Sequence, residues 1–204
     1  MKKKTIDINT HERILASAKK IFYLKGLDGA RMQEIADEAN INKAMLHYYF
    51  RNKEALFDAV FAEATGNILP QVSELLNAEM PLLEKISYFT DKYITILSEN
   101  SVIPAFIIKE MNNNPEKFFK IFKEKVRFKP DVFIKQIRSA VRDGVIKPVD
   151  PVQLFLNMIS LCIFPFLARP MIMSVFEMND EDFRKFLTKR KKEIPVFIIN
   201  SIKI

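Results

Sequence analysis

The chain has 204 residues, of which 49% are hydrophobic, so it can bury the core of one or two modest domains. A net charge of +7 suits a polyanionic partner such as a nucleic acid. The single cysteine, Cys162, excludes an internal disulfide framework, and no apolar segment follows the charged N-terminus as a secretion signal requires. These features predict a cytoplasmic protein.

The first predicted element is a helix that ends at Gly26. Residues 1–8, which include three consecutive lysines, are expected to form a flexible arm ahead of it. Apolar residues then recur at helical spacing and give the helix one buried face, at Ile14, Leu15, Ala18, Ile21 and Phe22.

Two short helices joined by a tight turn are predicted over residues 32–50. The first helix places apolar residues on one face, at Ile35, Ala36 and Ala39. Asn40 tolerates the left-handed conformation that ends a helix, and Asn42 is a favoured N-cap for the helix that follows. This organisation is typical of a helix-turn-helix, which places its second helix in the DNA major groove.

The second helix of this motif carries different chemistry on its two sides. Leu46 and Phe50 share an apolar side that can be buried. The remaining positions present a cation, an imidazole and a phenol, which stay available to a partner. Asn52 is expected to cap a third helix that starts at Lys53.

The stretch over residues 12–61 resembles the DNA-binding domain of TetR-family transcriptional regulators. The resemblance is carried by ERILASAKKIFYLKGLDGA, IADEANINKAMLHYYF and NKEALFDAV, which fit the family's spacing without gaps. It implies an all-α protein with an N-terminal three-helix, homeodomain-like helix-turn-helix domain over residues 1–56. A C-terminal helical domain for effector binding and dimerisation would then cover residues 57–204.

The resemblance also implies which residues contact DNA. Base edges would be read by Lys43, Ala44, Met45, His47 and Gln33. Phosphates would be contacted by Tyr48, Lys53 and Arg31. A lysine can donate to guanine in the major groove, whereas alanine or methionine can contact a thymine methyl group.

This chain departs from the family's usual pattern at three places. Ala30 and Arg31 stand where Thr–Thr or Thr–Ser is common, so the helix that follows loses its side-chain N-cap, at a cost of about 1 kcal/mol. Asn40 replaces the usual turn glycine, and His47–Tyr48–Tyr49 replaces the order Tyr–Tyr–His. We expect Tyr49 to pack beneath the helix rather than to contact DNA.

The chain after residue 57 is predicted to be helical throughout. Helices are expected over residues 53–77, 82–99, 102–111, 116–142, 151–167 and 181–202, and Pro130 should bend or break the fourth of them. The most apolar stretch, residues 152–168, is shorter than the roughly 20 residues that a membrane span needs. No membrane association is therefore predicted.

The resemblance implies a homodimer in which the last two helices of each copy form a four-helix bundle. The expected interface residues are Leu154, Phe155, Met158, Leu161, Cys162, Phe186, Phe197 and Ile198. A dimer contacts two half-sites, so the operator is expected to be a palindromic DNA duplex.

The middle helices of the family enclose an effector pocket. In this chain they are rich in aromatic residues and methionine, which suits a small apolar or aromatic effector. The candidate lining residues are Phe89, Tyr93, Phe106, Glu110, Phe119, Phe122, Phe133 and Met158. An ordinary helical core would contain the same residue types, so this pattern alone leaves both interpretations open.

No enzyme, cofactor or metal site is predicted, because no nucleophile motif, phosphate loop or metal-ligand spacing is present. The predicted function is a homodimeric, ligand-responsive transcriptional regulator, expected to be a repressor that its effector releases from the operator. The alternative is a DNA-binding or adaptor protein of the same fold that a protein partner controls. A filled core after Leu82 would favour this alternative, and a cavity would favour the sensor.

Overall fold

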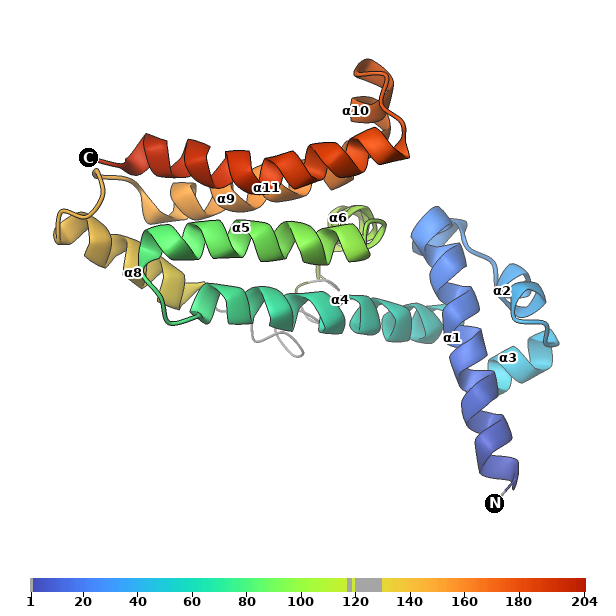
Figure 1. The fold of residues 1–204 in the computed structure, drawn as a ribbon. Coiled ribbons are helices and arrows are strands. Elements are labelled where there is room, and N and C mark those ends of the chain that lie inside the picture. Colours follow the sequence, from blue (N-terminus) through green and yellow to red (C-terminus); the bar gives the residue numbers. More distant parts are fainter. Residues whose placement is uncertain (1, 117–118, 120–129) are drawn as a thin grey trace. The chain divides into compact units, whose positions relative to one another are not determined.

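The computed structural model describes residues 2–116, 119 and 130–204, and helices account for every regular element in these ranges (Figure 1). The absence of strands from the described residues agrees with the predicted all-α class. The helices are α1 (Lys2–Gly29), α2 (Met32–Glu38), α3 (Lys43–Tyr49), α4 (Lys53–Asn77), α5 (Leu82–Glu99), α6 (Ile103–Asn113), α8 (Asp131–Arg142), α9 (Pro151–Leu167), α10 (Arg169–Val175) and α11 (Asp180–Ile202).

The chain divides into two compact units. The first comprises Met1–Asn67 and Ala105–Val126, and the second comprises Ile68–Pro104 and Arg127–Ile204. Both α4 and α6 therefore contribute residues to each unit. The sequence predicted a domain boundary after residue 56. The structure instead divides the chain within α4, and most of α6 belongs to the first unit.

The helix α1 differs from its prediction at both ends. It is helical from Lys2, although a flexible arm was expected over residues 1–8. Lysine is a good helix former, and no glycine or proline interrupts the run, so a helix can extend through it. Near its other end α1 kinks at Gly26, whose φ of 72° and ψ of −175° suit glycine alone.

An aromatic cluster joins α1, α4 and α6 within the first unit. The rings of Phe22 and Phe57 meet edge to face, with centroids 5.1 Å apart. Phe106 on α6 lies 4.9 Å from Tyr23, 5.7 Å from Phe57 and 5.8 Å from Phe61. Each such pair contributes about 0.5–1.5 kcal/mol beyond the area that it buries. The cluster therefore fixes α6 against α1 and the first turns of α4.

The second unit is built on three mutually contacting helices, α5, α9 and α11, which Figure 1 shows running side by side. The apolar stripe of α5 explains this position, because its members are spaced to face both neighbours. They are Leu82, Ile86, Phe89, Tyr93, Ile94, Ile96 and Leu97, all buried. The helix α8 packs against α5 and α9.

Local capping signals determine where these helices begin. The Asp150 carboxylate accepts a hydrogen bond from the Gln153 amide at 2.8 Å and starts α9. Asn179 and Asp182 form a capping box that starts α11. Pro130 occupies the N-cap of α8, where its missing N–H costs nothing. Residues 117–118 and 120–129 of the predicted 116–142 segment lie outside the described residues.

The helix α10 was not predicted, and it follows α9 after a sharp bend. It contacts α9, and the side chain of its Ile172 is buried. No single described helix is long and apolar enough to cross a membrane. The bent pair α9 and α10, at 72° to each other, satisfies the criteria of length and composition only when both helices are counted together.

Lys85 and Cys162 are two ionisable side chains buried in the second unit. The Lys85 ammonium donates to the Leu76 carbonyl at 3.2 Å, at the C-terminal end of α4, where the helix dipole favours a cation. Burial lowers the pKa of Lys85. Burial also raises the pKa of Cys162 to about 12, so this thiol is a small core residue and is unreactive at neutral pH.

Candidate nucleic-acid interface

The helices α2 and α3 are held by a small apolar face. Ile35, Ala36, Ala39 and Leu46 are all fully buried within the first unit. Between the helices, Asn40 has a φ of 51°, which confirms the left-handed turn residue expected from the sequence. Because alanine lets two backbones approach closely, α2 and α3 pack tightly although each has only seven residues.

The start of α3 is fixed by its own cap. The Asn42 side chain accepts a hydrogen bond from the Met45 amide at 2.7 Å. Asn52 does the same for the start of α4, accepting from the Ala55 amide at 2.8 Å. The orientation of α3 is therefore set by the protein itself. Arg31 supplies no side-chain cap to α2, as the sequence predicted.

Five of the predicted DNA-contact residues lie on α3 and are exposed, and we call this set the α3 surface. Its members are Lys43, Ala44, Met45, His47 and Tyr48. Met45 is 42% exposed and Tyr48 is 80% exposed, which is unusual for such large apolar groups in a folded domain. The ammonium of Lys43, the methyl groups of Ala44 and Met45 and the phenol of Tyr48 thus lie together on one short helix.

The three remaining predicted residues surround α3. Gln33 donates to the Asp37 carboxylate at 2.8 Å on the exposed side of α2. The Lys53 ammonium donates to the Ala30 carbonyl at 3.2 Å and so joins the start of α4 to the segment before α2. Arg31 is exposed. Gln33 and Lys53 must therefore share or exchange a hydrogen bond in order to contact DNA.

The tautomer of His47 is set by its neighbour on the chain. Its Nδ1 lies 3.3 Å from the Arg51 carbonyl oxygen, which can only accept. The hydrogen of the neutral ring is thus on Nδ1, and Nε2 is left as an acceptor. An acceptor in the major groove suits the amino group of adenine or cytosine.

Several contacts that sequence reasoning missed join α1 to the helix-turn-helix. Lys20 pairs with Glu38 at 2.8 Å, and Lys25 pairs with Glu34 at 2.9 Å. The hydrogen bond from Lys25 lowers the pKa of Glu34. Periodicity within one helix gives no signal for such pairs, because their partners lie on different helices. Exposed pairs of this kind position helices more than they stabilise them.

His11 was a further omission. Its ring stacks on Phe50 with centroids 5.2 Å apart, and it lies 6.2 Å from the ring of Tyr49. Tyr49 is half-buried, in agreement with the expectation that it packs beneath α3. The end of α3 is thereby supported from α1.

The helix α6 contacts α1 at its kink. Glu110, 4% exposed, accepts a hydrogen bond from the Leu27 amide at 3.3 Å. A Cβ atom at Gly26 would lie 2.8 Å from the same carboxylate, so only glycine allows this approach. The Lys109 ammonium donates to the Lys25 carbonyl at 3.5 Å. The sequence predicted Glu110 as an effector anchor, whereas its carboxylate is bonded to α1.

The other predicted effector residues are divided between the two units. Phe89, Tyr93, Phe133 and Met158 are buried in the second unit, where the rings of Phe89 and Tyr93 lie 5.1 Å apart. Burial raises the pKa of Tyr93. In the first unit, Phe106 belongs to the aromatic cluster and Phe119 is 58% exposed. Phe122 lies outside the described residues.

The predicted dimer residues also differ in exposure. Four of them are enclosed by their own chain, namely Leu154, Met158, Cys162 and Ile198. Phe155, Leu161 and Phe186 are half-buried, and Phe197 is 66% exposed. Other large apolar side chains of the same helices are exposed as well, namely Val152, Leu156 and Phe164 of α9 and Val196 of α11.

A hollow of about 500 Å³ lies over α9 and α11 at this place. Phe164 and Phe197 line it together with Leu161 and Arg190, whose guanidinium donates to the Leu161 carbonyl at 2.6 Å. Burial lowers the pKa of Arg190.

Residues 14–60 match the family model of bacterial regulatory proteins of the tetR family. The chain is 25% identical over 150 residues to the HTH-type transcriptional regulator YhgD of Bacillus subtilis, covering 72% of this chain and 76% of that protein. It is 22% identical over 202 residues to IcaR, the negative transcriptional regulator of the icaADBC biofilm operon of Staphylococcus epidermidis, covering 92% and 98%.

Solved structures share the fold along nearly the whole chain. The hemolysin II transcriptional regulator HlyIIR is 25% identical, with a TM-score of 0.64 over 96% of this chain and 98% of that one. FadR of Bacillus subtilis, solved in complex with stearoyl-CoA, is 15% identical, with a TM-score of 0.64 over 92% and 97%.

The uncapped start of α2 gives a testable consequence. Arg31 has the extended backbone of an N-cap, with φ −118° and ψ 137°, but no capping side chain. We predict that Arg31→Ser raises the free energy of unfolding by about 1 kcal/mol, because the serine oxygen can accept from a free amide of the first turn. Urea denaturation measures this, with Arg51→Ser as the matched control. Equal stability of the two variants would contradict the prediction.

Proposed function

We propose, from its membership of the TetR family of bacterial transcriptional regulators, that this chain is a homodimeric repressor in the bacterial cytoplasm. In this proposal it binds a palindromic operator through the α3 surface and leaves it when an effector binds. The observation that carries the DNA-binding role is the α3 surface itself. Both ends of α3 are fixed without DNA, and the exposed residues can therefore meet base edges at little cost in ordering.

The residues around the α3 surface support phosphate contacts. Tyr48 is exposed, and Lys53 lies in the first turn of α4, where free amides also favour an anion. The exposed Arg31 adds a third donor on the same unit. Base contacts would then come from Lys43, Ala44, Met45, His47 and Gln33, with His47 acting through its acceptor nitrogen.

We predict that Tyr48→Ala and Lys53→Ala each weaken binding to a duplex that the wild-type protein selects from a random library. The loss should be similar for all sequences, and Lys53→Ala should reduce the slope of log affinity against log salt by about 1. Fluorescence anisotropy at several salt concentrations measures both. Lys92→Ala, an exposed lysine of α5, is the control. An unchanged slope would exclude the phosphate contact.

The dimer surface that we propose consists of the exposed apolar residues of α9 and α11. Phe197, Val196 and Phe164 are more than half exposed, and Leu156 is 48% exposed. Apolar side chains at this density on two packed helices favour burial against an equivalent surface. The half-buried Phe155, Leu161 and Phe186 would contribute at its border, and the hollow beside Phe197 would accept a partner's side chain.

The dimer is tested at Phe197. We predict that Phe197→Lys converts a dimer at micromolar concentration into a monomer, because two lysines would face each other in an apolar interface. Analytical ultracentrifugation measures the state, and operator affinity should fall with it because two half-sites are no longer bound together. Leu24→Lys, at an exposed residue of α1, is the control. A dimeric Phe197→Lys protein would place the interface elsewhere.

We further propose an apolar effector of the acyl-thioester class. FadR binds stearoyl-CoA, and the fold is shared along nearly the whole chain. The second unit offers aliphatic and aromatic side chains that suit an acyl group, including Phe89, Phe133 and Met158. The helices α4 and α6 contribute residues to both units. A shift of either helix in the second unit would therefore displace its residues in the first unit.

The contact of Glu110 with Leu27 gives this shift a route to α3. This hydrogen bond joins α6 to the kink of α1. The ion pair between Lys25 and Glu34 in turn joins α1 to α2. A ligand that prefers the arrangement in which these contacts are displaced lowers DNA affinity by population shift, and a preference of about 1–3 kcal/mol suffices for a 5–150-fold effect.

We predict that stearoyl-CoA lowers operator affinity several-fold in fluorescence anisotropy, whereas free coenzyme A does not, because the acyl chain supplies the differential binding. Saturable binding of stearoyl-CoA without any change in operator affinity would separate binding from regulation. If stearoyl-CoA neither binds nor releases the operator, the proposed effector class is wrong and the DNA-binding role is unaffected.

A second candidate is control by a protein partner without a small effector. The observation in its favour is that the described candidate lining residues, apart from the exposed Phe119, are packed into the core or used elsewhere. Phe106 is part of the aromatic cluster, and Glu110 is bonded to α1. Under this candidate, operator release would require a macromolecule.

A further inference from the structure

A second hollow lies on the second unit, and neither the dimer surface nor the proposed effector residues account for it. It has a volume of about 470 Å³ and extends over α5, the ends of α9 and α10, and the first half of α11. We call it the α5–α11 groove. Its lining residues of aromatic or aliphatic character are Phe166, Phe183 and Leu187, each no more than 7% exposed, so the floor is apolar.

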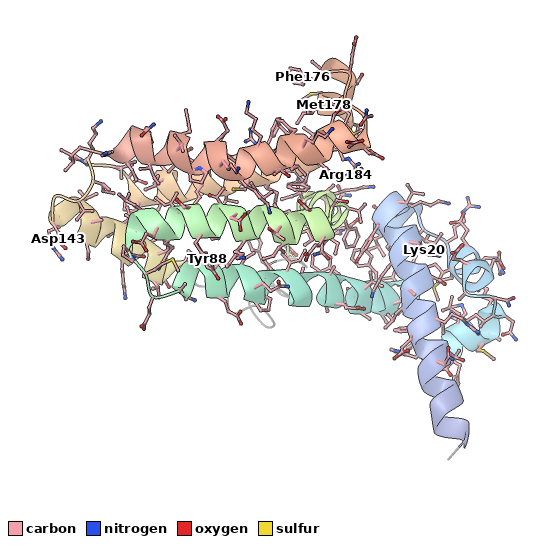
Figure 2. All side chains as sticks on the ribbon, viewed as in Figure 1. Lys20, Tyr88, Asp143, Phe176, Met178 and Arg184 are labelled. Carbon is pink, nitrogen blue, oxygen red and sulfur yellow. The ribbon has the colours of Figure 1, made fainter. Side chains whose placement is uncertain are left out.

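Cations are arranged along one side of this groove. Arg184, Thr188 and Lys191 are spaced i, i+4 and i+7, so they lie on one face of α11, and the two cations are separated by about 10 Å along the helix. Figure 2 shows Arg184 near the beginning of α11. Among the described residues, the Arg184 guanidinium has no ion pair, whereas the other cations of the groove are engaged.

The engaged cations are held in place by neighbouring side chains. The Lys191 ammonium donates to Thr95 Oγ1 at 2.6 Å and lies 3.4 Å from the Asp91 carboxylate. Arg169 pairs with Asp180 at 2.8 Å and lies over the ring of Phe183, 5.2 Å from its centroid. These contacts already satisfy much of the charge on Lys191 and Arg169, which leaves Arg184 as the available anion-binding group.

Hydroxyl groups complete the border of the groove. The Ser98 hydroxyl donates to the Ile94 carbonyl at 2.7 Å, and the Thr188 hydroxyl donates to the Arg184 carbonyl at 3.0 Å. Each keeps lone pairs for solvent or a ligand. Glu99 is the one carboxylate among the described lining residues, and two of the three lining cations, Lys191 and Arg169, are paired with Asp91 and Asp180. The border is therefore polar, with the unpaired cation Arg184 above an apolar floor.

We propose that the α5–α11 groove is a binding site for a small amphipathic carboxylate. The Arg184 fork matches the two oxygens of a carboxylate, and an apolar body of up to about ten carbon and oxygen atoms can cover Phe183 and Leu187. A neutral apolar molecule would leave Arg184 unused, and an inorganic anion would leave the floor exposed to water. The site is independent of the operator and of the proposed effector.

Octanoate is a suitable probe, because it joins one carboxylate to a flexible apolar chain. Full-length protein labelled at leucine, isoleucine and valine methyl groups is titrated with octanoate and followed by NMR. We expect saturable shifts centred on Leu187. Arg184→Glu should weaken binding about tenfold or more, since a charge-assisted hydrogen-bonded pair contributes about 1.5–3 kcal/mol and repulsion adds to its loss.

Controls separate the contributions of charge, chain and groove. Arg138→Glu, an exposed arginine of α8, changes net charge equally and should leave the octanoate affinity unchanged. Ser98→Trp fills the groove without altering charge and should abolish the shifts, with circular dichroism reporting that the helices persist. Acetate and 1-octanol, which carry only the head or only the chain, should bind far more weakly.

The proposal is overturned by any of three results. The first is that octanoate produces no saturable shift at Leu187 in the wild-type protein. The second is that the Arg184→Glu and Arg138→Glu variants bind octanoate equally well. Finally, 1-octanol could bind as tightly as octanoate, which would show that apolar burial alone is responsible.

Discussion

The burial of one face of α2 and α3 sets the orientation of the α3 surface. Leu46, Ile35 and Ala36 are enclosed completely, and each successive residue of a helix points about 100° away from the last. Once Leu46 is fixed inward, the orientation of the α3 surface follows. The caps at Asn42 and Asn52 then set where α3 begins and where α4 takes over. A seven-residue helix has no stability of its own, so this packing supplies it.

The elements that could be predicted from the sequence are those that depend on residues close to one another in the chain. The bounds of α4 and α5, the left-handed Asn40 and the caps at Asn42 and Asn52 all depend on neighbouring residues, and they agree with expectation. Contacts between distant segments gave no such signal. Glu110 was expected to face an effector, yet it is bonded to Leu27, and α10 follows a bend that periodicity does not announce. Four predicted dimer residues proved to be core because apolar periodicity does not distinguish a core from an interface.

Function in this chain depends on two units that share helices. The first unit carries the α3 surface, the aromatic cluster and the contact between α6 and α1. The second carries the apolar surface of α9 and α11 and the α5–α11 groove. Both units contain part of α4 and part of α6.

We propose that the outward residues of α3 determine which DNA the protein binds. The most direct measurement is selection of duplexes from a random library by the wild-type protein and by a variant with Lys43, Met45 and His47 all replaced by alanine. These side chains are exposed, so the variant should fold with nearly unchanged stability. We predict that the triple-alanine variant selects a different DNA sequence or none. Selection of the same sequence with the same affinity would contradict it.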